Sequence, residues 1–273
     1  NHRVRALFDP EVTTETHIAD NQFGALEREN YFPETETWEE KGWHEKYYPI
    51  FPQQAYVEAS DGEHGLAVFN RGLPQYEVLN GAHPTLAVTL LSGVDYLGKR
   101  NLVNRPGRRS GVHVPTPDAQ LKGKFEVEYA IKPHVGNYRE GRVPEAAYSY
   151  TAPFYAAVEE STDEYVSPLE KEENADSILP DDHQLLKVKA GTVATSAVKK
   201  AERESAIIWR LYNPLTEEQT GVELEFAADF FSGVEETNLN EQVVTNSKFK
   251  INGNKILVPE LKSNEIINLK LQL

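Results

Sequence analysis

Short segments with alternating apolar and polar residues recur along the chain, and this two-residue period is typical of half-buried β-strands. Arg3–Phe8 alternates charged and apolar residues, and Phe125–Ile131 places four apolar side chains on one face. Thr85–Leu91 is instead almost continuously apolar and rich in β-branched residues. We therefore predict strands at all three segments, the last of them a central strand covered on both faces.

Turn residues separate further strands. Asp61 and Gly62 lie between Ala55–Ser60 and Leu66–Asn70, and an Asp-Gly pair in that position predicts a β-hairpin. Gln75–Leu79 is the next strand that we expect. Val143–Tyr150 is the best helical candidate, because Pro stands near its start and Glu-Ala-Ala follows.

The second half of the chain predicts a separate small β-sandwich, because six short strand-like segments follow at regular spacing. An Asn-Gly pair between apolar flanks, Asn252 and Gly253, indicates another hairpin there. These six segments are Leu185–Val188, Val193–Lys199, Ala206–Tyr212, Gly221–Phe226, Val243–Ile251 and Ile266–Leu271.

An acidic, polar stretch at residues 159–182 separates the two halves, and its composition indicates a linker. We predict a mainly β protein with one short helix. A large, supersandwich-like β-sandwich occupies residues 1–165, a linker or crossover residues 166–184, and a small C-terminal β-sandwich residues 185–273.

Composition narrows the classes of protein that fit. Hydrophobic residues make up 39% of the chain, ample for a packed core, and no apolar run is long enough to suggest a membrane span. A net charge of −15 argues against a nucleic-acid partner. The absence of cysteine fits a cytoplasmic location. Methionine is absent too, and the chain begins Asn-His-Arg, so we expect a fragment of a longer protein.

Familiar catalytic and metal-binding motifs are not found. The eight histidines are scattered without metal-ligand spacing, and with 43 acidic residues no pair of carboxylates stands out as catalytic. The sequence also lacks the nucleophile elbow and the glycine-rich phosphate loops. We therefore assign no catalytic residue and no metal ligand.

A long loop at Val94–Gly123 holds the most notable polar cluster, with Arg100, Arg105, Arg108 and Arg109. Loops of this length inside β domains are often functional. The planar guanidinium suits carboxylates and sugar hydroxyls, so the loop could cap a site of a neighbouring domain. Alternatively, it is a solvated loop that balances local acidic charge.

Several blocks resemble the C-terminal β region of bacterial glycoside hydrolase family 38, whose members include α-mannosidases and mannosylglycerate hydrolases. The most specific is Asp61–Val78, which contains Asn-Arg-Gly-Leu-Pro-Gln-Tyr-Glu. The other blocks follow in the order of the family: His2–Phe8, His17–Arg28, Thr85–Gly98, Pro115–Gln120, Phe125–His134 and Ala206–Leu215.

The resemblance implies a parent enzyme that hydrolyses terminal α-mannosides with retention, by an Asp nucleophile and a second carboxyl group. It also implies a zinc ion held by His and Asp. All of these groups belong to the family's N-terminal catalytic domain, so we expect no cofactor in this chain and no activity from it alone. Asp20, near Phe23 and Gly24, imitates a catalytic motif, but its neighbours match the β region and it is not assigned as a nucleophile.

The same resemblance implies partners and a site. The β region packs on the catalytic domain of the same chain, and one of its loops brings an Arg to the α-mannoside in the cleft; a homo-oligomer is also compatible. By order along the chain this loop is Val94–Gln120. The candidates are Arg105, Arg108 and Arg109, with Asp118 and Gln120 as weaker ones.

Two other interpretations stay open. A free-standing carbohydrate-binding β-sandwich would use exposed aromatic rings, and Trp38 and Trp43, near Tyr47 and Tyr48, could form such a platform. These residues could equally pin the polar segment Glu27–Pro52 onto the sheet. A third interpretation is a pure interaction surface, with an apolar patch that promotes self-association.

Overall fold

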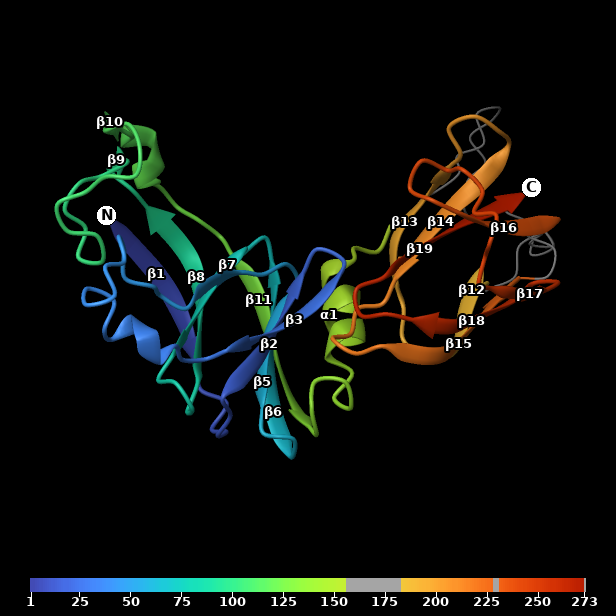
Figure 1. Ribbon diagram of the computed structural model, residues 1–273, viewed down its shortest axis with the longest axis horizontal. Helices are drawn as coiled ribbons and strands as arrows, with labels where there is room; N and C mark the ends of the chain where they lie inside the picture. Colours follow the sequence, from blue (N-terminus) through green and yellow to red (C-terminus); the bar gives the residue numbers. More distant parts are fainter. Residues whose placement is uncertain (156–182, 228–230, 273) are drawn as a thin grey trace, which may run out of the picture. The chain divides into compact units, whose positions relative to one another are not determined.

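The computed structural model describes residues 1–155, 183–227 and 231–272, which form two compact units (Figure 1). Unit 1 comprises Asn1–Thr151, Tyr212–Glu218 and Lys262–Ile266. Unit 2 comprises Ala152–Leu211, Gln219–Leu261 and Ile267–Leu273. The predicted linker, residues 166–184, lies outside the described residues except for its last two. The described residues are mainly strands with a single α-helix, as predicted.

Unit 1 contains two antiparallel sheets with an apolar core between them. In the first sheet the strands β1, β8, β7 and β4, in that order, span His2–Phe8, Thr85–Gly93, Gln75–Leu79 and Ile50–Pro52. In the second, β11, β6, β5, β2 and β3 span Glu128–Val135, His64–Arg71, Tyr56–Ser60, Thr16–Asn21 and Gly24–Glu29. Val57 and Val68 of the second sheet pack with Val78, Leu86 and Val88 of the first.

The helix α1 (Val143–Thr151) covers the other face of the five-stranded sheet. Its Val143 and Ala147 are fully buried against Tyr56 and Phe69. Because this sheet has one face on its partner sheet and the other on α1, β5 is buried at four of its five positions. The predicted helix, the predicted hairpin and the central strand β8 are all confirmed.

Short elements complete unit 1: the 3-10 helices η1 (Pro33–Thr35) and η2 (Pro117–Gln120), and the two-residue strands β9 (Tyr96–Leu97) and β10 (Val114–Pro115). β11 starts three residues later than the apolar alternation suggests. It is an edge strand, and the apolar row that leads into it is exposed: Phe125, before the strand, and Ile131, within it, are both more than half accessible.

Unit 2 is a sandwich of two four-stranded sheets around one apolar core. In the first sheet β12, β15, β18 and β17 span Leu186–Ala190, Gln219–Phe226, Lys255–Leu261 and Lys250–Asn252. In the second, β13, β14, β19 and β16 span Ala194–Lys200, Ala206–Tyr212, Ile266–Gln272 and Gly233–Thr237.

The prediction of a strand at Val243–Ile251 is wrong. Val243 makes a single bridge to Thr237, and a strand begins only at Lys250. The side-chain oxygen of Asn238 accepts hydrogen bonds from the backbone amides of Asn240 and Gln242, so the preceding residues turn rather than extend. The strand β16, just before this turn, was not predicted.

Candidate functional site

The arginine-rich loop leaves the end of β8 and returns through η2, and backbone hydrogen bonds close its neck. The amide of Val94 donates to the carbonyl of Ala119 (3.0 Å), and the amide of Thr116 to that of Asp95 (2.8 Å). Between them β9 and β10 pair, and the ring of Tyr96 stacks on that of His113 with 4.5 Å between centroids. This closure holds the long loop as a defined projection of unit 1 (Figure 1).

Arg105 anchors this projection to the segment before β4. Its side chain is only 11% exposed, and its Nη1 lies 3.0 Å from Glu45 Oε2. Asn104 supports the contact, because its side chain donates to Glu45 and its carbonyl accepts from the amide of Lys46 (2.8 Å). The Arg105 guanidinium is therefore largely engaged within the protein, and its role in the structure is to hold the loop.

Arg108 and Arg109 are both exposed. Arg108 contacts Nδ1 of His44, whereas Arg109 has no hydrogen bond or ion pair to any residue that the structure describes. These two guanidinium groups, unlike that of Arg105, are accessible to a ligand.

The structure also places the two tryptophans in relation to the loop. Trp43 precedes His44, is 40% exposed, and has the ammonium of Lys41 5.6 Å from its ring centroid. The amide of Trp43 donates to the carbonyl of half-buried Trp38. The segment that carries Trp38 and Trp43 therefore meets the arginine loop at the contact between Arg108 and His44, which are 64 residues apart in sequence.

Asp118 and Gln120 lie in η2 at the neck of the loop. Asp118 is exposed, and Gln120 is half-buried with its Nε2 lacking a hydrogen-bond partner among the described residues. Neither residue is joined to the arginines by a contact that the structure records. Both therefore belong to the base of the projection.

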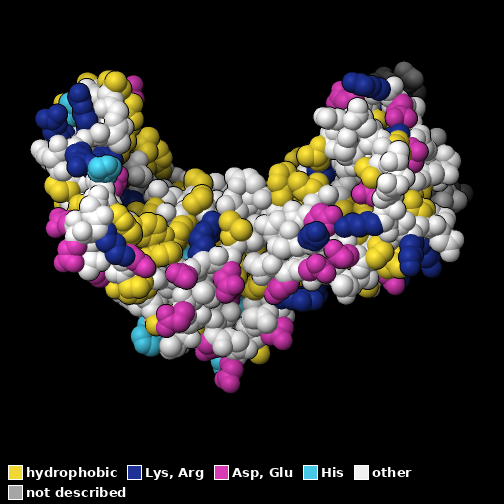
Figure 2. Space-filling view, viewed as in Figure 1, with side chains coloured by type: hydrophobic (Ala, Val, Ile, Leu, Met, Phe, Trp, Pro, Cys, Tyr) yellow, Lys and Arg dark blue, Asp and Glu magenta, His cyan; other side chains and the backbone are white. Residues whose placement is uncertain are grey.

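The projection is basic within an acidic protein. Residues 94–124 carry seven Lys and Arg against two Asp, while the whole chain has a net charge of −15. Figure 2 shows Lys and Arg side chains gathered at this end of unit 1. A concentration of guanidinium groups favours ligands that present carboxylate or hydroxyl oxygens.

Asp20, the residue that imitates a catalytic motif, lies in the interior of unit 1. It is 2% exposed, and its carboxylate accepts hydrogen bonds from the Tyr148 hydroxyl (3.0 Å) and the Ala55 amide (3.1 Å). Burial raises the pKa of Asp20 to about 6. The carboxylate of Asp20 is therefore almost completely enclosed within unit 1.

The described residues offer no group of three or more His, Asp or Glu side chains arranged to hold a metal ion. They therefore do not fit the zinc ion of family 38. Within the same residues, no helix has the length and apolar character needed to cross a membrane.

Comparisons with known proteins agree with the fold. The family model for the glycosyl hydrolases family 38 C-terminal beta sandwich domain matches residues 192–269. A putative mannosylglycerate hydrolase of Halalkalibacterium halodurans is 33% identical over 150 residues, which are 54% of this chain and 14% of that protein.

Solved structures extend the likeness to nearly the whole chain. An α-mannosidase from Enterococcus faecalis V583 aligns with a TM-score of 0.71 and 26% identity, and a family 38 glycosyl hydrolase from Enterococcus faecalis with 0.69 and 26%. Each alignment covers 99% of this chain and 26% of the other. The resemblance predicted from the sequence is confirmed, and the chain spans about a quarter of the length of these structures.

Proposed function

Since the chain carries the C-terminal β-sandwich of glycoside hydrolase family 38, we propose that it is the non-catalytic β region of an α-mannosidase-type enzyme. The observation that carries this is the alignment of 99% of the chain with only 26% of an α-mannosidase. The parent enzyme, in a cytoplasmic setting, hydrolyses terminal α-mannosides with retention. Its carboxyl groups and a zinc ion belong to an N-terminal catalytic domain.

An exposed apolar row in unit 1 supports docking against that catalytic domain. Phe125, Val127, Tyr129 and Ile131 alternate along and just before the edge strand β11, and each is at least 39% exposed. The ring of Tyr129 lies 5.5 Å from that of Phe8 on β1, the edge strand of the other sheet. Contiguous apolar surface of this kind is typical of an interface with another domain.

The arginine projection supports a contribution to the substrate cleft. Arg105 fixes the loop to the body of unit 1 through Glu45, so that Arg108 and Arg109 are presented on a supported loop. Positioned donors of this kind can bind sugar hydroxyls at little entropic cost. Arg108 and Arg109 are the residues that we propose contact the α-mannoside, with Arg105 as a positioning residue.

The test is steady-state hydrolysis of an aryl α-mannoside by the full-length parent enzyme. We expect Arg108→Ala or Arg109→Ala to lower kcat/KM by about tenfold or more, the loss of at least one charge-assisted hydrogen bond. Arg203→Ala, an exposed arginine in unit 2, is the matched control and should be neutral.

Two results would contradict the proposal. The loop is structural if neither variant changes kcat/KM by more than a few-fold. The assignment of the chain as non-catalytic fails if the 273-residue chain alone hydrolyses the aryl α-mannoside at the full-length rate.

A further inference from the structure

The strand β11 presents an open backbone edge. It pairs with β6 on one side, and no described strand lies on its other side. Pro133 has no N–H to donate, so it occupies a non-hydrogen-bonded position opposite β6, and such positions alternate along an antiparallel pair. The amide of Gly136 donates to the carbonyl of Glu63 (2.8 Å), which agrees with this alternation. The N–H and C=O groups of Tyr129 and Ile131 therefore point away from β6.

This edge is blocked in one part and open in another. Pro133 blocks strand addition toward the C-terminal end, because an approaching strand finds no N–H donor there. No proline interrupts the edge between Phe125 and Ile131. Residues 121–129 are all exposed, and residues 124–127, just before β11, belong to no helix or strand. The open part of the edge is therefore the part that leads into β11 and forms its first half.

The apolar side chains of this open part lie on the inner face of the sandwich. Tyr129 contacts Phe8 on the opposite sheet, whereas the neighbouring Ala130 packs with Val143 and Ala147 of α1 on the other face. The alternate residues from 125 to 131 thus face the side of the four-stranded sheet, yet each is at least 39% exposed. The part of the chain that the structure describes leaves this inner row uncovered.

We propose that a β-strand from the part of the parent enzyme outside this chain pairs with the open edge along Phe125–Ile131. An added strand satisfies the outward N–H and C=O groups of Tyr129 and Ile131, and its alternate apolar side chains pack beside the exposed row. Since 99% of this chain aligns with only 26% of an α-mannosidase, most of such an enzyme lies outside the chain and can supply the strand. The inference rests on the proposed function and gives its domain contact a specific form.

A second copy of this chain fits the same edge less well. Two antiparallel copies paired along Phe125–Ile131 would be centred on Glu128. That register sets Glu128 opposite its own copy and Lys124 opposite Lys132. Like charges directly opposite each other destabilise a strand pair, which favours a different sequence as the partner.

The test is hydrogen–deuterium exchange of backbone amides, resolved to single residues, in the full-length parent enzyme and in the 273-residue chain alone. We expect the amides of Tyr129 and Ile131 to exchange about a hundredfold or more slowly in the full-length enzyme, because they become hydrogen-bond donors there. The amides of Ala130 and Lys132 point toward β6 and serve as internal controls, with protection in both samples.

A proline variant tests whether the covering element is a paired strand. Ile131→Pro removes an outward donor without breaking a hydrogen bond to β6, so in the full-length enzyme the exchange of Tyr129 should accelerate by about tenfold or more. Ile131→Ala keeps the donor and should retain the protection. Val135→Pro, at the same kind of position beyond Pro133, is the control for the proline itself.

Three outcomes would overturn the inference. The first is equally fast exchange of Tyr129 and Ile131 in the chain alone and in the full-length enzyme, a comparison that does not depend on the variants folding. The second is protection in the chain alone that is lost on dilution, which would identify a second copy as the occupant. The third is continued protection of Tyr129 in Ile131→Pro.

A separate activity measurement distinguishes this inference from the proposed function. An enzyme that hydrolyses the aryl α-mannoside while the two amides stay unprotected would refute the strand pairing alone. Protected amides in a parent enzyme without α-mannosidase activity would support the strand pairing and refute the proposed function.

Discussion

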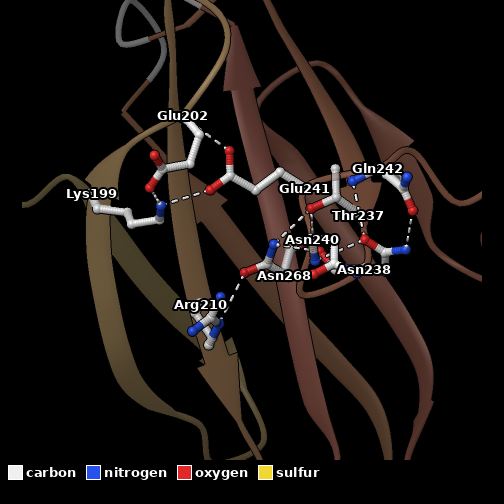
Figure 3. A network of polar contacts seen from close by, with 9 residues as sticks. All are labelled: Lys199, Glu202, Arg210, Thr237, Asn238, Asn240, Glu241, Gln242 and Asn268. Carbon is white, nitrogen blue, oxygen red and sulfur yellow. Dashed lines mark hydrogen bonds and ion pairs between the residues drawn. The ribbon is translucent and has the colours of Figure 1, made fainter.

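The two units differ in how they bury polar side chains. A cluster of apolar side chains fills the space between the sheets of unit 2, and a network of polar residues lies along the sheet that contains β14 and β19 (Figure 3). There Asn268 donates to the Thr237 hydroxyl (2.7 Å) and accepts from Arg210 Nε (3.1 Å). Lys199 forms ion pairs with Glu202 and Glu241 at the rim.

Unit 1 buries several ionisable groups, whereas unit 2 buries Lys270, which is 4% exposed and forms ion pairs with Glu204 and Glu235. His17, Asp20 and Glu58 are each at most 2% exposed, and Glu77 is 6% exposed beneath Arg3 and Arg5. Interior charges are expensive, so their presence points to ligand binding or to pH-dependent stability rather than to stability alone. The comparison indicates that the stability of unit 1 depends on pH through buried ionisable groups, whereas the core of unit 2 rests on apolar packing.

The strongest test of this contrast is a truncation in the core of unit 2. Phe226 is 1% exposed, and its ring lies 5.5 Å from that of Trp209 and 5.3 Å from that of Phe231. We expect Phe226→Ala to lower the free energy of unfolding by about 3–5 kcal/mol, because the substitution removes a buried ring and leaves a cavity that neighbouring side chains do not fill. Chemical denaturation followed by tryptophan fluorescence measures the change.

Leu239→Ala is the control for this truncation, since Leu239 is 58% exposed. Its expected cost is below about 0.5 kcal/mol. If Phe226→Ala cost no more than this control, the stability of unit 2 would not rest on its apolar core.

The second test uses the buried pair His17 and Asp20, three residues apart on β2. Burial lowers the pKa of His17 from 6.5 to about 4, so its contribution to stability is lost as pH falls from about 6.5 to about 4. Burial raises the pKa of Asp20 from 3.8 to about 6, so its contribution is lost as pH rises from about 3.8 to about 6. The two effects oppose each other across nearly the same window.

Replacing one of the two groups should make the pH dependence of stability caused by the other measurable. At about 1.4 kcal/mol per pKa unit, each effect amounts to about 3 kcal/mol. Relative to the unmodified protein, Asp20→Asn should lose stability as pH falls from 7 to 4, and His17→Gln should gain it. Denaturation curves at several pH values measure this, and parallel pH profiles for the two variants would contradict the opposition.

The sequence predicted much of the architecture and little of the detail at the sites. Alternation, turn residues and the Pro at the start of the helix identify local elements such as the β5–β6 hairpin and α1, because their determinants lie within a few residues. The difference between Arg105 and Arg108 depends on Glu45 and His44, about 60 residues away, and a single sequence does not reveal that pairing. The exposure of Phe125 could not be predicted for the same reason. Alternation shows which residues share one face of a strand, but not whether another element covers that face.

The smallest of the three effects tests the outer polar network of unit 2. Asn268 is 2% exposed, although it alternates along β19 with the core residues Ile267 and Leu269. Asn268→Ala should cost about 1–3 kcal/mol, because Thr237 and the carbonyl of Asn238 lose a donor in a buried setting. Asn240→Ala, at an exposed position of the adjoining turn, is the control and should be near neutral, and equal losses in the two variants would show that the network contributes nothing beyond local turn formation.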